Sequence, residues 1–572
     1  MQKQISHFRH RLANANSLLH LSALGVLSGF CCALVMLAFR FAIETPSALW
    51  LPGNNPENFE ALPAWLHFVL PIAGALMIGL LLKPLLTADT RTGVPHVITH
   101  LHAHHGHMPT KNALVQFFGG ALAFATGQSG GREGPAIHLG AAANSLLGQK
   151  LLLPNNSIRT LVGCGAAAAI AASFNTPIAG VIFAMEVIMM EYTVTGFIPV
   201  MLAAITGTAV SRAVYGSEVI FTIPPIEMAS LLELPFIAFL GLVIGACAAL
   251  FMGILKAALR LSAQPVLNRM LLAGLLTGSC AFLVPEIMGI GYDSLNAALS
   301  NQLSISLLLA LIAAKIIATA ASTGLGMPIG LIGPNLLIGA CIGSALSGLS
   351  VYLFPELTSH RSFYVLLGMG AMMGAVLNAP LAALMTLLEL SNNTAMIFPG
   401  MLAITIATLT NSEIFKQYSA HQTILKHLKQ TLPTDPVSLA LQRTGVASVM
   451  QRSITTTAEQ VSVEDVHQLI AGNYDWYIIG TDSNSNLQLI NKEDLRGPLE
   501  TTLIDTTVTV VDLLEIASHS YPIAELHIQA TLREALTTMD ANNVDALYIS
   551  GPYPDNGIVT RSDIERYYHT PQ

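Results

Sequence analysis

The chain has 572 residues, of which 52% are hydrophobic and only 10% are charged, and its formal net charge is −8. This is the composition of a polytopic membrane protein, and the sequence has no basic run that would suggest nucleic acid as a partner. The six cysteines all lie in apolar segments without metal-ligand spacing, so neither a disulfide framework nor a cysteine metal site is expected.

Residues 1–17 form a basic stretch that we predict to be a cytoplasmic helix, without the small-residue cleavage site of a removable signal peptide. Apolar segments then recur from residue 18 to about residue 410, within a membrane domain that we place at 18–425. Many of them reach the roughly 20 residues that cross a bilayer as a helix. They predict an all-α multi-pass membrane domain.

The apolar segments are interrupted by Gly and Pro, and the interruptions recur in the same order in two halves of the chain. "GREGPAIHLG" (131–140) and "NTPIAGVIFAME" (175–186) correspond to "GLIGPNLLIG" (330–339) and "NAPLAALMTLLE" (378–389). Broken helices at membrane depth must line a cavity or be buried in protein. We therefore predict two repeats, at about 64–215 and 230–410, with a transport site at their interface.

The glycine-rich breaks also indicate the charge of the ligand. A helix start exposes unpaired N–H groups and a partial positive charge, which favour anions. Burying a bare ion costs on the order of 20 kcal/mol in the Born limit, whereas one helix end returns at most about 2 kcal/mol. Several helix starts must therefore converge, and "RTGVP" (91–95), "GREGP" and "GLIGP" are the candidates.

A soluble α/β region follows the membrane domain. We place a linker at 426–444 and two copies of one unit at 445–572. The segments "DWYIIGTD" and "DALYISG" are typical of strands, and "VSVEDVHQLIAG" and "TLREALTTMDANN" of helices. The pair is expected to be a small regulatory domain.

These motifs carry a family resemblance. The ordered phrases "RTGVP", "FFGG", "GREGP", "NTPIAGVIFAME", "GLGMPIGLIGP" and "GMGAMMGAVLNAP" resemble the CLC family of chloride channels and chloride/proton antiporters over roughly residues 10–425. The resemblance implies an inverted-repeat membrane domain (18–425) in a homodimer, with one chloride pathway per subunit. It also implies a transporter rather than an enzyme, without a cofactor, in the inner (plasma) membrane of a bacterium, with both termini cytoplasmic. The C-terminal pair resembles tandem CBS domains.

The resemblance makes Glu133 of "GREGP" the gate of the pathway. In proteins similar to this one, the carboxylate occupies an anion position and swings out when it is protonated or displaced. A carboxylate in a site built for anions competes with them, so opening should depend on pH and on anion concentration. The alternative, a structural ion pair between Arg132 and Glu133, is disfavoured because adjacent helical residues point about 100° apart.

The resemblance assigns chloride binding to the backbone N–H groups of Leu331 and Ile332 and to the hydroxyl of Thr92, with Arg132 nearby. The chain departs from the family pattern twice, because Thr92 replaces a serine and Ile332 a phenylalanine. Thr keeps the hydroxyl donor but changes the shape of the site, which leaves the choice between chloride and nitrate open. The pathway tyrosine is Tyr418 by spacing, although the phrase "EIF" would select Phe415 instead.

Proton-coupled members of the family commonly carry a second glutamate where this chain has Val187. Glu186 faces another direction on the same helix, whereas Glu191 is expected to share the face of Val187. We therefore favour channel-like conduction, with chloride/proton exchange as the alternative. In that alternative Glu133, Glu191, Glu186 or a water chain would carry the proton.

Two further motifs have competing interpretations. The six histidines of residues 96–107, "HVITHLHAHHGH", are expected to form a solvated loop, and a metal transporter is a distant alternative. In the tail, "GIVTRSDI" (557–564) resembles a CBS phrase, which makes Thr560 and Asp563 candidate contacts for an adenine nucleotide. A purely structural, dimerising tail is equally consistent with the sequence.

Overall fold

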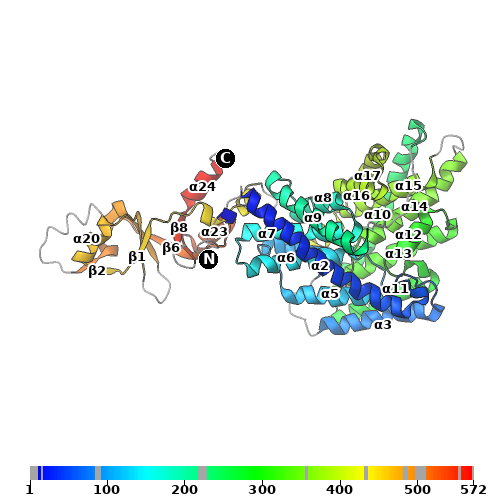
Figure 1. The fold of residues 1–572 in the computed structure, drawn as a ribbon, viewed down its shortest axis with the longest axis horizontal. Coiled ribbons are helices and arrows are strands. Elements are labelled where there is room, and N and C mark those ends of the chain that lie inside the picture. Colours follow the sequence, from blue (N-terminus) through cyan, green and yellow to red (C-terminus); the bar gives the residue numbers. More distant parts are fainter. Residues whose placement is uncertain are drawn as a thin grey trace. The chain divides into compact units, whose positions relative to one another are not determined.

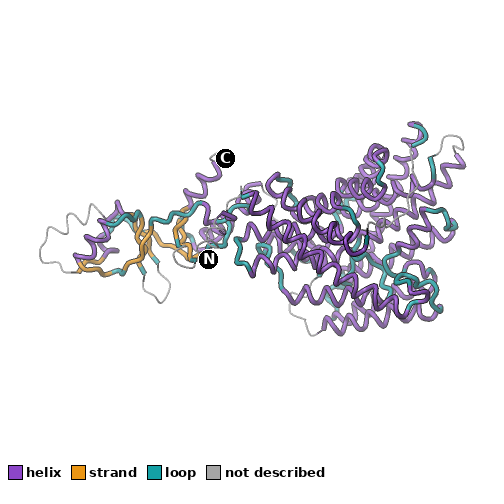
Figure 2. The backbone as a smooth tube through the Cα atoms, in the orientation of Figure 1, coloured by secondary structure: helices purple, strands orange, loops and turns teal. Residues whose placement is uncertain are grey.

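A computed structural model describes residues 9, 11–13, 17–83, 92–216, 228–353, 359–430, 436–480, 487–495, 510–551 and 556–569. The chain divides into two compact units. One unit comprises Leu21–Gln149 and Ile158–Leu432, and the other comprises Met1–His20, Lys150–Ser157 and Pro433–Gln572. Helices make up the first unit, and the described strands all belong to the second (Figure 2).

The helices of the first half of the membrane unit are α2 (Leu18–Trp50), α3 (Ala64–Leu82), α4 (Gly93–Ala103), α5 (Thr110–Ala125), α6 (Glu133–Lys150), α7 (Asn155–Phe174), α8 (Pro177–Phe183) and α9 (Val194–Tyr215). Those of the second half are α10 (Leu234–Leu259), α11 (Val266–Leu283), α12 (Tyr292–Leu299), α13 (Ile305–Leu325), α14 (Ile332–Leu353), α15 (Arg361–Leu377), α16 (Pro380–Ser391) and α17 (Ile397–Leu409), followed by α18 (Ala420–His427). Figure 1 shows their packing.

Among the described residues, nine helical stretches are long and apolar enough to cross a membrane. Between them lie much shorter helices, of which α4, α8 and α12 have 11, 7 and 8 residues. The prediction of a multi-pass helical domain with broken helices is therefore confirmed. The short helices place several helix starts inside the packed unit, where sequence reasoning required them.

The two halves repeat the same helix order, from α2–α9 to α10–α17. Close glycine contacts repeat as well. Gly140 of α6 meets the backbone of Gly165 on α7, and Gly339 of α14 meets Gly368 on α15 in the same way. A side chain at any of these four positions would collide with the facing backbone, so glycine permits the close helix packing.

Two glutamates cap helices of the opposite repeat. The Glu389 carboxylate accepts hydrogen bonds from the N–H groups of Ile178 (2.9 Å) and Ala179 (2.7 Å) at the start of α8. The Glu186 carboxylate accepts from Leu381 (3.3 Å) and Ala382 (2.7 Å) at the start of α16. Each carboxylate satisfies two unpaired donors and meets the positive end of a helix dipole. We name these two contacts the reciprocal caps.

The second unit holds a six-stranded sheet with the strand order β1-β3-β4-β6-β7-β8. The elements of this unit are β1 (Ile454–Thr457), β2 (Gln460–Ser462), α20 (Val463–Ala471), β3 (Trp476–Ile479), β4 (Gln488–Asn491), β5 (Val510–Asp512), α22 (Leu513–Ile516), β6 (Tyr521–His527), α23 (Leu532–Asn542), β7 (Ala546–Ser550), β8 (Gly557–Thr560) and α24 (Arg561–His569). In each copy, a parallel pair across a helix is followed by an antiparallel strand. The predicted strands and helices of the two-copy tail are all present.

The segment predicted as a linker contains a helix, α19 (Pro436–Gln442). Leu441 of this helix and Val446 pack in the same hydrophobic cluster as Leu532 of α23. The compact tail therefore begins before residue 445. The sequence did not indicate this, because the window around α19 is too short to show a clear apolar period.

Candidate functional site

The starts of α6 and α14 are joined through their preceding glycines. Gly131 and Gly330 exchange two backbone hydrogen bonds, 2.8 and 2.6 Å long, as an isolated antiparallel bridge. A Cβ on Gly134 would meet the Gly330 backbone at 2.7 Å. The "GREGP" and "GLIGP" phrases thus bring two helix starts together, as the anion-site argument requires.

Glu133 is fully buried at the first residue of α6. Its Oε1 accepts a hydrogen bond from the hydroxyl of Tyr292 (3.0 Å), and its Oε2 accepts one from the N–H of Gly333 (3.2 Å). Gly333 is the second residue of α14, so the carboxylate lies at a helix start of the opposite repeat. It occupies a position whose donors would suit a free anion equally well.

Arg132 is directed away from this carboxylate. Its guanidinium donates to the Ser173 carbonyl (3.2 Å) and lies 3.5 Å from the Glu44 carboxylate. Its Cζ is 5.4 Å from the centroid of the Tyr292 ring. The side chain therefore belongs to a polar network on the Tyr292 side of Glu133.

Two cavities lie next to these residues. The first has a volume of about 560 Å³, and Gly134 and Ile137 of α6 are part of its lining. The second has a volume of about 460 Å³, and Arg132 and Tyr292 are part of its lining. The two sequence neighbours of the buried Glu133 therefore line different cavities: Gly134 lines the first and Arg132 lines the second.

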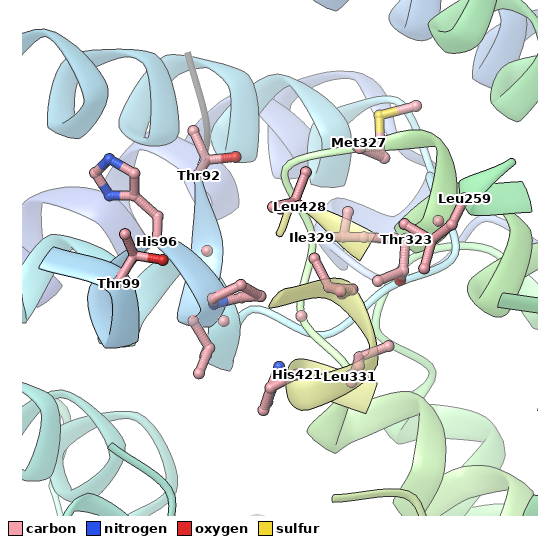
Figure 3. Close-up of a pocket in the computed structure, with 18 of the residues that line it drawn as sticks. Thr92, His96, Thr99, Leu259, Thr323, Met327, Ile329, Leu331, His421 and Leu428 are labelled. Carbon is pink, nitrogen blue, oxygen red and sulfur yellow. The ribbon is translucent and has the colours of Figure 1, made fainter. Parts of the chain in front are cut away.

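The first cavity brings together three of the predicted anion ligands, since Thr92, Leu331 and Ile332 all line it. Figure 3 shows Thr92 and Leu331 on this lining. Thr92 precedes α4 in extended conformation, and its hydroxyl does not cap that helix. The N–H of Gly93 donates to Gln116 (2.7 Å), which fixes the start of α4. The cavity therefore collects a hydroxyl and the start of α14 from opposite repeats.

The aromatic ligand expected at Tyr418 or Phe415 is not part of this lining. Both side chains are about half exposed, and the ammonium of Lys426 lies 3.0 Å from the centroid of the Tyr418 ring. Tyr418 precedes the N-cap of α18, and His421, one residue into that helix, lines the cavity instead.

The geometric reason for choosing Glu191 was wrong. Helix α8 continues into a π-helical turn, Ala184–Met189, and Met190 takes the left-handed conformation (φ 56°). Glu191 lies after the helix end, so it does not share a face with the buried Val187 one turn earlier. Glu186 serves as one of the reciprocal caps.

The histidine-rich segment is a loop only at its end, 104–107, where His104 is exposed. Residues 96–103 belong to α4, and His96, His100 and His102 are at most 6% exposed. The prediction was wrong because it counted histidines and ignored their spacing of four residues. Within the described ranges, no group of three or more His, Cys, Asp or Glu side chains is arranged to hold a metal ion.

In the tail, Thr560 and Asp563 bind each other. Asp563 accepts hydrogen bonds from the Thr560 hydroxyl (2.7 Å) and from both the Thr560 N–H and the Gln451 side-chain amide (3.0 Å each). Gln451 also accepts a hydrogen bond from the indole N–H of Trp476 (2.9 Å). These contacts tie the start of α24 to the first copy, which supports the structural interpretation of the motif.

Sequence reasoning missed Tyr292, His138 and His421. Tyr292 had a signal, because α12 occupies the place in the second repeat that α4 occupies in the first, and Tyr292 is its first residue. His138 lies five residues after Glu133 on α6 and had no signal beyond its type.

Comparisons with known proteins agree with this architecture. The family model described as voltage gated chloride channel matches residues 74–412. A putative chloride channel protein ClcB-like from Ralstonia nicotianae is 31% identical over 67% of this chain and 91% of its own length. The H(+)/Cl(-) exchange transporter ClcA of Vibrio cholerae is 29% identical over 74% of this chain and 91% of its own length.

Solved structures show the same fold. A slow cyanobacterial Cl⁻/H⁺ antiporter covers 71% of this chain and 97% of its own, with a TM-score of 0.63 at 21% identity. A eukaryotic CLC transporter covers 96% of this chain and 98% of its own, with a TM-score of 0.61 at 18% identity, so its fold extends over the tail as well. With its repeated broken helices and the matching family model, the chain belongs to the voltage gated chloride channel (CLC) family of membrane anion transporters.

Proposed function

We propose that the protein exchanges chloride for protons across the membrane, with Glu133 as the group that both gates the anion pathway and carries the proton. One observation carries the proposal: the Glu133 carboxylate accepts the Gly333 N–H at a helix start while its chain neighbours line two different cavities. A carboxylate in that place excludes an anion while charged and gives way when protonated.

The expected preference for a channel gives way to exchange. That preference rested on Val187 in place of a second glutamate, but H(+)/Cl(-) exchange transporters from Vibrio species are among the relatives, together with a putative ClcB-like channel. The 560 Å³ cavity is large enough for many water molecules, whose share of liquid volume is about 30 Å³ each. Water in it can supply protons without a glutamate at that position.

In this mechanism chloride is held in the first cavity by the helix starts at Leu331 and Ile332 and by the Thr92 hydroxyl. Protonated Glu133 no longer needs the Gly333 N–H as a partner for its charge, so the anion can take that donor. Return of the carboxylate releases the anion and blocks the path. Arg132 and Tyr292 line the second cavity on the other side of the gate, where Tyr292 donates a hydrogen bond to the Glu133 carboxylate.

The homodimer expected from the resemblance also belongs to the proposal. Exposed apolar side chains on α8, α9, α16 and α17 offer a surface for a second copy; they include Ile178, Ile205, Leu381, Phe398 and Met401. The CBS-like tail is proposed as a regulatory domain facing the cytoplasm, with nucleotide binding as its optional feature.

Purified protein in liposomes tests the exchange. Chloride efflux and external pH are recorded together under a chloride gradient, with potassium and valinomycin setting the voltage. Uphill proton movement that stops when chloride is replaced by an impermeant anion is the expected result. Chloride flux at an unchanged external pH would instead establish a conductor, and an absence of chloride flux would refute anion transport.

A further inference from the structure

Helix α13 carries a charged residue in the middle of a membrane-spanning stretch. Lys315 is fully buried, and the helix around it, Ile305–Leu325, is long and apolar enough to cross a membrane. Ionisable residues at that depth are costly, and they usually serve a partner or a pathway. Neither the gate nor the anion ligands account for this lysine, so its contacts must indicate what it does.

The ammonium of Lys315 binds two backbone carbonyls. Its Nζ donates to the oxygen of Ile287 (2.8 Å) and to the oxygen of Gly289 (3.2 Å). Both residues are buried, so their carbonyls need donors from the protein. The ammonium also reaches the residue before α12, because a Cβ on Gly291 would lie 3.4 Å from Nζ. Lys315 therefore fixes the segment that leads directly into α12.

This segment carries the tyrosine that binds the gate. Tyr292 is the first residue of α12, and its hydroxyl donates to the Glu133 carboxylate. The two glycines before it, Gly289 and Gly291, have φ angles of 62° and 86°, so the backbone makes a tight turn that glycine permits. Where the tyrosine hydroxyl points depends on how this turn is held. The two hydrogen bonds from Lys315 hold it.

The same turn is joined to the chain that leads into the gate helix. The N–H of Gly130 donates to the Gly289 oxygen (3.4 Å), which is also an acceptor for Lys315. Gly130 directly precedes "GREGP", at which α6 begins. One carbonyl oxygen thus connects α13, the turn before α12 and the approach to α6. Both partners of the gate contact, Tyr292 and Glu133, follow segments that meet at this oxygen.

The matching position of the first repeat has a related role. Gln116 of α5 lies 15 residues before the first glycine of "GREGP", and Lys315 lies 15 residues before the first glycine of "GLIGP". Gln116 is fully buried as well. Its Oε1 accepts the Gly93 N–H at the start of α4 (2.7 Å), and its Nε2 donates to the Pro328 carbonyl (3.1 Å). In each repeat, this position therefore fixes the start of a short helix that borders the site.

We propose that Lys315 is a positioning residue of the gate, which holds the turn before α12 so that Tyr292 keeps the Glu133 carboxylate in its buried position. Lys315 acts through the tyrosine and not on the carboxylate itself. Without its two hydrogen bonds, the turn is held less firmly and the tyrosine hydroxyl donates to the gate less often. The inference rests on Glu133 as the gate in the proposed function, and it holds whether or not protons are exchanged.

A double-mutant cycle in the liposome chloride-efflux assay tests the inference. Lys315→Met keeps the apolar stem of the side chain but has no N–H donor. We expect chloride turnover to rise several-fold, as for Tyr292→Phe, and to rise no further in the double variant, because both changes act on one contact. Lys315→Arg restores the donors and should return turnover towards wild type. The matched control is Lys256→Met on α10, since the Lys256 ammonium bonds to Gln417 instead, and its turnover should equal wild type.

The outcomes separate this inference from the proposed function. An unchanged or lower turnover in Lys315→Met, or a double variant that multiplies the two single effects, overturns the inference while anion transport stands. An equal rise in Lys256→Met also overturns it, because the effect would then be general. Wild-type protein without chloride flux refutes the proposed function itself.

A milder variant decides if Lys315→Met does not fold. The side chain in Lys315→Gln is one atom shorter and cannot reach both carbonyls. A rise in turnover that Tyr292→Phe does not multiply supports the inference, and a wild-type turnover overturns it.

Discussion

The two repeats have the same backbone arrangement at the site but different side chains there. "GREGP" and "GLIGP" both begin a long helix after a glycine bridge, and the glycines pair with each other. The position of Glu133 in the first repeat is held by Ile332 in the second. The titratable group comes from one repeat and the N–H of Gly333 that binds it from the other. The backbone arrangement common to both repeats therefore forms the site, and the residues that differ between the repeats make the site responsive to protons and anions.

Replacing Glu133 by Gln removes the main difference between the two helix starts and should have the largest effect. The amide cannot take up or release a proton at physiological pH, so proton flux should fall about a hundredfold or more and chloride flux should lose its pH dependence. Paired pH and chloride electrodes on liposomes measure both. Retained pH dependence in this variant would refute the gate assignment.

Variants of the two glutamates that form the reciprocal caps test whether the two repeats are equivalent in stability. Glu186→Gln and Glu389→Gln should each cost about 1–2 kcal/mol of stability, because a charged acceptor at a helix start is lost. Thermal unfolding in detergent should give similar shifts for the two variants, while the proton to chloride ratio stays at the wild-type value. A selective loss of coupling in Glu186→Gln would instead place that residue on the proton path.

Tyr292→Phe tests the donor that the second repeat offers to the gate. The hydroxyl holds the carboxylate in its buried position, and a hydrogen bond to a charged group contributes about 1.5–3 kcal/mol. We expect chloride turnover to rise several-fold, because the Glu133 side chain should move out of its buried position more readily. Tyr364→Phe is the control, since that buried tyrosine bonds to Glu233 away from the gate. Unchanged turnover in Tyr292→Phe would show that this bond does not hold the gate closed.

The smallest expected effect concerns the residues that precede α4 and α12, which are Thr92 and Gly291. Thr92→Val keeps the shape of the side chain but removes its hydroxyl, at a cost of about 1 kcal/mol for a bound anion. Competition between chloride and nitrate for uptake should shift by a few-fold. An unaltered preference would mean that the Thr92 hydroxyl does not contact the anion.

Sequence reasoning succeeded where the chemistry was carried by the backbone. The glycine–proline breaks predicted helix starts, the repeat predicted that they meet, and Leu331 and Ile332 were found in one cavity with Thr92. A prediction that depended on the end of a helix failed, because Glu191 was placed on a face that a π-helical turn and Met190 remove.

The histidines show a different limit. A spacing of four residues was visible at positions 96, 100 and 104, but a polar composition suggested solvent, and burial followed from packing against helices distant in the chain. His138 is 42 residues away from its partner His96 in the sequence, so a local pattern could not connect them. Contacts of this kind require the tertiary structure.

The reciprocal caps also constrain how such a chain can have arisen. Neither glutamate serves a helix in its own repeat, so half of the molecule would expose two uncapped N–H groups at the start of α8 or α16. A single-repeat ancestor would have needed a second copy of itself in the opposite orientation to satisfy them. Gene duplication and fusion would then have preserved an existing pairing between subunits, and the later exchange of one buried residue for a glutamate would have sufficed to give one half a gate.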